Sequence, residues 1–244
     1  MNNKTYYKVL RDGQSTHGGD LTWSLPKDDD KVPGEWHEVS GEIILCKYGL
    51  HLTDKPIVWF GNKDCEVYEV EIDESKEVVV GDDDKIAVQR CRLLRRLPNE
   101  ELSNDHDIHV FTSGEHKVKS GKCFSSGNST VNASGNSRVR AFGNSTVNAS
   151  GNSLVNASDN SRVYASDNSR VYAYGYSKVY ASGYSTVTAY GYSTVTAYGN
   201  STVRAYGNST VNASGQSVVK ISIYYSEGVK VTSGEESVVI DRRD

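Results

Sequence analysis

The chain has 244 residues, a formal net charge of −4 and a hydrophobic fraction of 36%, and this length allows two domains. No stretch approaches the roughly 20 apolar residues of a membrane span, and the opening MNNKTYYKVL lacks the apolar core of a secretory signal. We therefore expect a cytoplasmic protein without a membrane partner. The cysteines lack the paired CxxC spacing of a zinc ribbon, so we expect free thiols.

The composition divides near residue 120. All histidines, tryptophans, prolines and cysteines precede Phe124. Residues 1–126 carry 17 basic and 24 acidic side chains, whereas residues 127–220 carry 7 basic and 2 acidic ones, so an acidic head precedes a basic repetitive segment. We predict a small domain at 1–98, a linker and lead-in at 99–126, repeats at 127–220 and a cap at 221–244.

The head contains short apolar runs separated by Gly, Asp and Pro clusters. Runs typical of strands occupy residues 6–10, 42–46, 67–72 and 77–80. Residues 86–97 fit a strand or a short helix, because their apolar positions follow neither period. We expect a small α+β or mostly β domain that ends at Pro98 and the polar stretch 99–107.

The head also contains residue types that acid–base or nucleotide chemistry requires. They are His17, His37, His51, Tyr6, Tyr7, Glu38 and Arg90. The simpler interpretation is that these side chains pack or cap a small domain, so we predict no catalytic residue, cofactor or metal. Two alternative metal sites would use Cys46 with His51, or His106 with His109, although a polar linker is the simpler setting for the second pair.

Four strings of the head resemble an uncharacterised domain of bacteriophage and gut-bacterial proteins, which often precedes octapeptide repeats of the GNSTV-A type. The strings are YYKVLRDGQSTHGGDLTW, GEWHEV, LCKYGLHLT and DKIAVQRCRLLR. For a phage-encoded chain, the resemblance implies the cytoplasm of the host cell. The arrangement of Lys8 on the first strand and a later Gly-Leu-His turn at 49–51 resembles that of ADP-ribosyltransferase folds. This resemblance implies an active site formed by a strand residue, a His/Tyr pair and a glutamate.

From Gly127 to Lys220 the chain repeats an eight-residue unit twelve times without insertion or deletion. Serine, valine and alanine recur at alternate positions of each unit and would share one face of a strand. Glycine opens each unit except at Asp159 and Asp167, and both residue types predict a corner. Such units bury their apolar face only by stacking, so the pattern predicts a β-solenoid.

The residue before each corner alternates between an aromatic and a serine type along most of the repeat. This alternation predicts a sixteen-residue coil with two sheets back to back, and six coils that rise about 29 Å at a strand spacing of about 4.8 Å. A triangular coil of three octads is the alternative. The small inward residues favour the two-sheet form.

The inward serines need hydrogen-bond partners, because a buried unpaired hydroxyl costs about 1–3 kcal/mol. We expect hydroxyl ladders along the axis and asparagine ladders at Asn128, Asn144, Asn160 and Asn208. A nucleophilic role for the serines is not expected, since no base accompanies them.

The outward positions in the middle of the repeat are basic and aromatic. The predicted partner-binding residues are Arg138, Arg140, Arg162, Tyr164, Arg170, Tyr172, Lys178, Tyr180 and Arg204. We expect a protein partner with an acidic surface; nucleic acid is the alternative, because such columns suit phosphates and bases. Alternatively, these residues are simply tolerated on exposed sheets.

Tyrosines at the corners form a second candidate surface. Tyr174, Tyr190 and Tyr206 predict an edge ladder of rings at which a second copy would dock. Both ends of the solenoid are expected to be covered: the lead-in at 116–126 precedes it, and after Ile221 the inward residues enlarge and the register shifts near Gly228.

The repeats are also similar in period to bacterial ice-nucleation repeats. Thr-x-Thr occurs only at 186/188 and 194/196, which makes ice binding the lesser alternative. The sequence thus predicts a non-enzymatic binding or scaffold protein. The resemblance of the head implies a phage origin, and a role as an inhibitor of a host defence factor would fit it. The other class is a head enzyme of nucleotide or ADP-ribose chemistry with the solenoid as its stalk.

Overall fold

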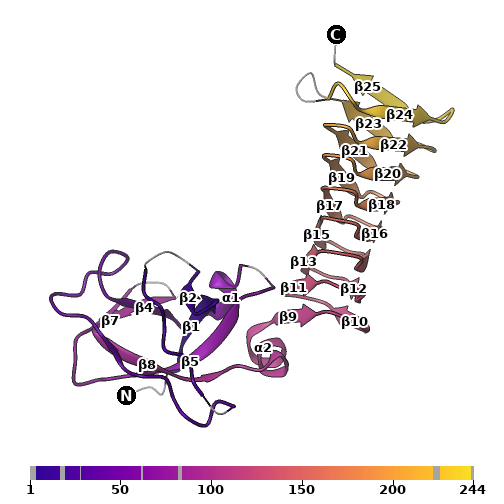
Figure 1. Ribbon diagram of the computed structural model, residues 1–244. Helices are drawn as coiled ribbons and strands as arrows, with labels where there is room; N and C mark the ends of the chain where they lie inside the picture. Colours follow the sequence, from indigo (N-terminus) through magenta and orange to yellow (C-terminus); the bar gives the residue numbers. More distant parts are fainter. Residues whose placement is uncertain are drawn as a thin grey trace. The chain divides into compact units, whose positions relative to one another are not determined.

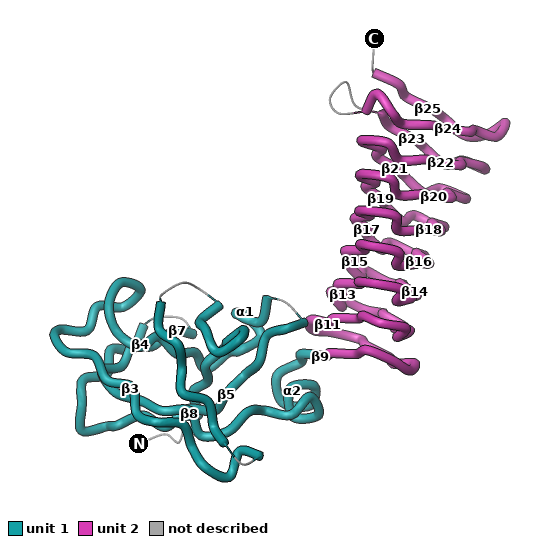
Figure 2. The backbone as a smooth tube through the Cα atoms, in the orientation of Figure 1, with its two compact units in different colours: residues 1–108 teal, residues 109–244 magenta. Residues whose placement is uncertain are grey.

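The computed structural model describes residues 4–16, 20–27, 29–61, 63–81, 84–221 and 226–242. It is mainly β, with 47% strand and 5% helix, and it contains a C-terminal β-solenoid after a β-rich N-terminal region. The predicted fold class is confirmed. The chain divides into two compact units, Met1–Ile108 and His109–Asp244 (Figure 2). His17 and residues 222–225 of the predicted cap lie outside the described residues.

The first unit, here called the head, is built on one antiparallel sheet in the order β3-β8-β5-β1-β4-β7-β6, with β2 paired to β1 (Figure 1). Two short helices, α1 and α2, accompany it. The elements are β1 Tyr6–Arg11, β2 Gln14–Ser15, β3 His37–Glu38, β4 Leu50–Thr53, α1 Pro56–Trp59, β5 Glu66–Ile72, β6 Val78–Val80, β7 Lys85–Val88, β8 Arg90–Arg96 and α2 Asn99–His106.

Three predicted strands of the head, at 6–10, 67–72 and 77–80, are confirmed as β1, β5 and β6, and the undecided stretch 86–97 forms β7 and β8. The strand predicted at 42–46 is wrong. Ile44 only bridges to Tyr48, and Cys46 has a φ of 61°, so this segment turns. Strands β2, β3 and β4 were not predicted, and β4 begins within the predicted Gly-Leu-His turn.

The polar stretch after Pro98 is a helix rather than irregular chain. Pro98 occupies the N-cap position, and Glu100 and Glu101 lie in the first turn, where carboxylates interact favourably with the helix dipole. Asp107 ends α2 in the left-handed conformation and donates its N–H to the carbonyl of Leu102. The segment predicted as a linker at 99–126 therefore contains α2 and three strands, β9 to β11.

The head buries large aliphatic and aromatic side chains between distant strands. Its core is formed by Leu10, Trp23, Leu50, Leu52, Tyr68, Val70, Ile86, Val88, Cys91 and Leu93. These residues come from β1, β4, β5, β7 and β8 and from the loop that contains Trp23, so the core depends on contacts between strands far apart in sequence.

The second unit is a solenoid of two parallel sheets (Figure 1). One sheet has the order β10-β12-β14-β16-β18-β20-β22-β24, and the other β25-β23-β21-β19-β17-β15-β13-β11-β9. The even strands are β10 Glu115–Val118, β12 Thr130–Ala133, β14 Thr146–Ala149, β16 Arg162–Ala165, β18 Lys178–Ala181, β20 Thr194–Ala197, β22 Thr210–Ala213 and β24 Lys230–Ser233. The odd strands are β9 Ile108–Phe111, β11 Lys122–Ser125, β13 Arg138–Ala141, β15 Leu154–Ala157, β17 Arg170–Ala173, β19 Thr186–Ala189, β21 Thr202–Ala205, β23 Val218–Ile221 and β25 Val238–Asp241.

Residues sixteen apart pair in register, as Val163 does with Val179. The sixteen-residue coil with two sheets is therefore confirmed, and the triangular alternative is wrong. The solenoid has about eight turns rather than six. Strands β9 to β11 extend the two sheets before the first octad, and β24 and β25 extend them after the last. In the predicted cap the register lengthens, since Lys230 pairs with Thr210. Strands β24 and β25 thus continue both sheets.

The interior of the solenoid is a narrow layer of valine, alanine and serine. The inward valines and alanines of the octads are 0–5% exposed. At the corners the glycines have a φ near +60°, which favours glycine. Asp159 and Asp167 adopt the same conformation, and each accepts a hydrogen bond at Oδ2 from the glycine N–H stacked one coil before it, Gly143 and Gly151, at 3.0 Å.

The predicted hydroxyl ladder is wrong. The Oγ atoms of eleven inward serines, every eighth residue from Ser137 to Ser217, are buried and have no hydrogen-bond partner among the described residues. Serines stacked in register lie about 4.8 Å apart, whereas hydroxyl groups need about 2.7–2.8 Å. The longer amide side chain does bridge the gap: Asn148 donates to Asn132, and Asn132 to Glu115, both at 2.7 Å. These asparagines are on the strands rather than at the predicted corner positions.

Candidate partner-binding surface

The predicted binding residues lie on two different sheets of the solenoid. Arg162, Tyr164, Lys178 and Tyr180 occupy the outer surface of the even-numbered strands, here called the even face. The odd face, formed by the odd-numbered strands, carries Arg138, Arg140, Arg170, Tyr172 and Arg204. All nine side chains are exposed, because their positions alternate with the buried valines and alanines. The structure therefore divides the predicted set into two surfaces.

On the even face, basic and aromatic residues form neighbouring columns. Arg162 pairs in register with Lys178 and Tyr164 with Tyr180. The two tyrosine rings stack at 5.0 Å with an angle of 11° between their planes. The parallel register produces this stack, because identical positions of successive coils lie at the strand spacing.

A groove of about 620 Å³ runs along the same face. Tyr164 and Tyr180 line one part of it, and Lys117, Asn132 and Lys119 line another. The sequence analysis missed both lysines. Lys117 pairs with Asn132 at a separation of fifteen residues instead of sixteen. Counting back from the octads in steps of sixteen therefore does not identify Lys117 as an outward position.

On the odd face the cations are more widely spaced. Arg138 and Arg170 flank Leu154 in one column. The guanidinium of Arg140 lies over the ring of Phe124, 5.9 Å from its centroid, and this cation–π contact holds it against the sheet. Arg204 lies between Thr188 and Lys220 in the next column.

Five exposed cations of the two faces are not neutralised by carboxylates of the described residues: Arg138, Arg162, Arg170, Lys178 and Arg204. In the segment 4–101, by contrast, charged side chains of described residues form nine ion pairs. The stacked pair Arg162 and Lys178 also places like charges on adjacent strands, an arrangement that an acidic partner would stabilise.

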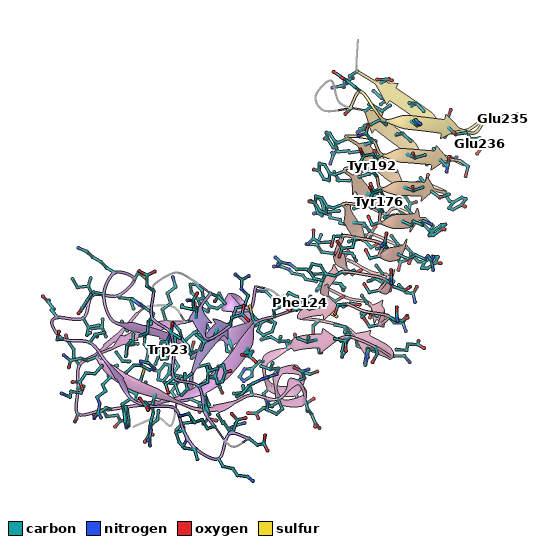
Figure 3. The ribbon with its side chains drawn as sticks, viewed as in Figure 1. Trp23, Phe124, Tyr176, Tyr192, Glu235 and Glu236 are labelled. Carbon is teal, nitrogen blue, oxygen red and sulfur yellow. The ribbon has the colours of Figure 1, made fainter. Side chains whose placement is uncertain are left out.

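The predicted self-association residues form a continuous ladder at one corner of the solenoid. The rings of Tyr174 and Tyr190 stack at 5.0 Å, and those of Tyr190 and Tyr206 at 5.1 Å. Burial of the middle ring raises the pKa of Tyr190, so its hydroxyl stays neutral. Tyr176 and Tyr192 form a second stack at 5.5 Å, whose position Figure 3 labels.

The two Thr-x-Thr pairs do not share a face. Thr186 and Thr188 belong to β19, whereas Thr194 and Thr196 belong to β20, so the pairs lie on different sheets. A repeated Thr-x-Thr array on one flat surface is therefore not formed by these residues.

In the head, the candidate residues separate into different environments. Tyr7 and His51 line a cavity together with Lys8. Glu38 and Arg90 form an ion pair at 3.4 Å, and Arg90 also binds Asp73 at 2.6 Å. This second group stabilises the edge of the sheet where β3 pairs with β8, and its members are not among the cavity residues.

Two other candidates have structural contacts. His37 accepts a hydrogen bond at Nε2 from the backbone N–H of Ser24 at 2.9 Å, and its ring lies 5.1 Å from that of Trp23. Burial lowers the pKa of His37, which agrees with a neutral ring that accepts this bond. The ring of Tyr6 forms a cation–π contact with Lys4, whose Nζ lies 5.7 Å from the ring centroid.

Of the residues considered as metal ligands, Cys46 and His51 line the same cavity of the head. The described residues contain no group of three or more His, Cys, Asp or Glu side chains suited to a metal ion. His106 packs edge-on against Tyr7 at 4.8 Å, and His109 stacks on Phe111 at 6.1 Å. All four cysteines are free thiols, three of them buried. Among the helices in the described ranges, none has the length and apolarity needed to cross a membrane.

Comparison of the whole chain with models of known protein families, with curated proteins and with solved structures gave no match.

Proposed function

We propose that this protein is a non-enzymatic binding scaffold whose solenoid engages an acidic surface of a partner protein. The observation that carries the proposal is the set of five exposed cations, Arg138, Arg162, Arg170, Lys178 and Arg204, that have no carboxylate partner in the described chain. On the even face, Arg162 and Lys178 lie next to the stacked rings of Tyr164 and Tyr180. A solenoid that served only as a spacer would have no need of such columns.

A protein partner fits these columns better than nucleic acid does. Tyrosine and arginine are the residues most enriched at the energetic centres of protein interfaces. On the even face, the basic pair of Arg162 and Lys178 is bordered by uncharged Thr146 and Thr194 in the same column. Nucleic acid binding generally uses a longer row of phosphate contacts, whereas a short charged patch suits one acidic site on a protein.

The resemblance of the head to phage and gut-bacterial proteins extends this proposal to a biological setting. A phage protein of this kind would act in the host cytoplasm, and a rigid binding surface is suited to block a host defence factor. The head would then anchor or orient the solenoid. This part of the proposal is tested by the identity of the captured partner.

The test is affinity capture from lysate of the native host, with the full chain as bait. The double variant Arg162→Gln/Lys178→Gln should lose the partner captured by the original chain, with an affinity loss of at least about tenfold for two charge-assisted contacts. The control is Lys27→Gln/Lys31→Gln, which removes the same charge from exposed positions of the head. It should retain the partner.

Two results would contradict the proposal. Equal capture by both double variants would show that the even face is not used. If the captured molecule were nucleic acid, its affinity would decrease steeply with added salt, and treatment of the lysate with nuclease would abolish capture.

A second candidate function is self-association through the tyrosine ladder of residues 174, 190 and 206. Tyr174 is 42% exposed, and an aromatic strip with polar hydroxyl groups suits a homodimer interface. The triple change to serine should halve the mass measured in solution by light scattering. An unchanged mass removes this candidate and leaves the even-face proposal intact.

A further inference from the structure

The head contains a cavity of about 670 Å³ that the binding scaffold does not require. Strand β1 contributes Lys8, strand β4 contributes His51, the turn before β4 contributes Tyr48, and α1 contributes Trp59. The volume falls within the range of about 300–1,000 Å³ that is typical of pockets for small organic ligands. Figure 3 labels Trp23, another residue of the cavity wall, within the head.

Lys8 is a buried cation without a counter-ion in the described chain. The residue is only 7% exposed. Its Nζ donates one hydrogen bond to the carbonyl of His51 at 2.9 Å and lies 4.9 Å from the centroid of a Trp23 ring. An ammonium group has three N–H donors, so two remain for another partner. Burying a charged group costs free energy unless an opposite charge lies beside it. An anion bound in the cavity would supply this opposite charge to the Lys8 ammonium.

His51 provides an unused acceptor in the same cavity. Its Nε2 is buried and has no hydrogen-bond partner among the described residues. Burial, with the nearby charge of Lys8, lowers the pKa of His51, and the ring bonds the backbone of Gly49. Because Nε2 is the nitrogen without a partner, the bond to Gly49 uses Nδ1. The neutral ring then presents a lone pair at Nε2 to a donor.

Two aromatic side chains of the wall are held in place by their polar atoms. Trp59 donates Nε1–H to Asp84, and Tyr48 donates its hydroxyl to the carbonyl of Ser40 at 2.6 Å. Both rings retain exposed surface. Rings that are fixed in this way offer flat apolar surfaces, on which a planar ligand packs with little loss of side-chain entropy.

The charge of the cavity is opposite to that of the head. Residues 1–108 carry 14 basic and 23 acidic side chains, yet the described residues that line the cavity include three lysines, Lys8, Lys47 and Lys85, and no aspartate or glutamate. Lys85 places its Nζ 4.9 Å from the centroid of a Trp59 ring. Cations and rings therefore lie side by side.

We infer that this cavity binds a small organic anion that carries a planar ring, of the mononucleotide class. The anionic group binds Nζ of Lys8, an N–H or O–H of the ligand donates to Nε2 of His51, and the ring packs against Trp59 and Tyr48. This inference does not depend on the solenoid, because every residue that it uses belongs to the head.

Calorimetric titration of the full chain at pH 7 tests the inference with three probes: adenosine monophosphate, adenosine and inorganic phosphate. The monophosphate should bind at least about tenfold more tightly than either fragment, because only it supplies both the ring and the anion. Lys8→Met should weaken its binding at least about tenfold, the effect of one charge-assisted hydrogen bond, and leave adenosine binding unchanged.

Lys63→Met is the matched control, since Lys63 forms an exposed ion pair with Asp64 and does not line the cavity. It should bind all three probes as the original chain does. Circular dichroism checks that each variant is folded, and the comparison of the three probes on the unchanged chain needs no variant at all. The inference is overturned if adenosine monophosphate fails to saturate a site or binds no more tightly than adenosine and inorganic phosphate, or if Lys8→Met binds it unchanged.

Discussion

The head and the solenoid differ in whether their arginines are paired with carboxylates. In the head, Arg90, Arg92, Arg95 and Arg96 each bind a carboxylate at 2.6–2.8 Å. In the solenoid, four arginines of the two faces, Arg138, Arg162, Arg170 and Arg204, have no carboxylate partner in the described chain. The arginines of the head thus stabilise its own sheet, whereas those of the solenoid remain available to another molecule. A high arginine content alone would not distinguish these two uses.

The two cores differ as well. The head packs large side chains from strands that are distant in sequence, so its stability depends on a few residues. The solenoid repeats small side chains in every coil, and each coil contacts mainly its neighbours. A single truncation should therefore have a larger effect in the head.

The largest expected effect tests this difference in cores. Leu93→Ala removes a 0% exposed side chain of the head core, and we expect a loss of about 2–5 kcal/mol in the free energy of unfolding. Val179→Ala in the solenoid removes less volume and should cost less. Urea denaturation measures both. Val80→Ala, at a 62% exposed position, is the control, and equal losses for Leu93→Ala and Val179→Ala would refute the comparison.

The second prediction concerns the unpaired charge inside the head. Burial lowers the pKa of Lys8 from 10.5 to about 8, so the unfolded chain binds a proton that the folded chain releases between these values. The contribution of Lys8 to stability therefore increases as the pH rises from about 8 to 10.5, by up to about 3 kcal/mol.

The titratable groups around Lys8 complicate a direct measurement. Burial raises the pKa of Cys91 from 9.0 to about 12. Above pH 9 the unfolded chain therefore loses the thiol proton while the folded chain keeps it, which lowers the free energy of unfolding. The difference in unfolding free energy between the original chain and Lys8→Met removes the larger part of this contribution, since burial, the main cause of the shifted pKa values of Cys91 and His51, acts in both chains. A difference that is constant from pH 7 to 10.5 would be incompatible with a depressed pKa of Lys8.

The third prediction concerns the corners of the solenoid. Asp159→Ala removes the carboxylate that accepts the Gly143 N–H hydrogen bond. It also leaves a residue with a Cβ at a φ of 55°, without the side-chain hydrogen bond that stabilises aspartate there. We expect a loss of about 1–2 kcal/mol. Asp159→Gly loses the acceptor but suits the backbone, so thermal unfolding should show a smaller loss. A larger loss for glycine would disprove this account of the corner.

The smallest effect distinguishes two kinds of serine. The Oγ of Ser177 is buried without a partner among the described residues, whereas that of Ser182 donates to the carbonyl of Ala165 at 3.2 Å. Ser177→Ala should therefore leave the free energy of unfolding unchanged or raise it, and Ser182→Ala should lower it by about 0.5–1.5 kcal/mol. Chemical denaturation of the two variants gives the signs. A loss at Ser177 would indicate a hydroxyl partner.

Much of the solenoid could be predicted from the sequence. The columns of serine, valine and alanine fixed the strands and their inward faces, and the alternating corners indicated two sheets, because each octad adds the same structure at the same place. The candidate binding residues were found for the same reason. The sequence did not reveal Lys117, whose strand departs from the sixteen-residue register, or Lys119, which follows that strand. It also did not reveal that the inward serines lack hydroxyl partners, which follows from the strand spacing.

In the head, the sequence determined little beyond the β-rich character and three of the strands. Only the tertiary structure decided that Lys8, His51 and Trp59 line one cavity, because β1 and β4 become neighbours through a sheet order that the chain order does not contain. In a repeat, neighbours in space are set by a constant separation in sequence, so the pattern itself carries the fold. In the antiparallel sheet of the head, each strand pair joins residues at a different separation in sequence, and only packing of the whole head selects among the pairings.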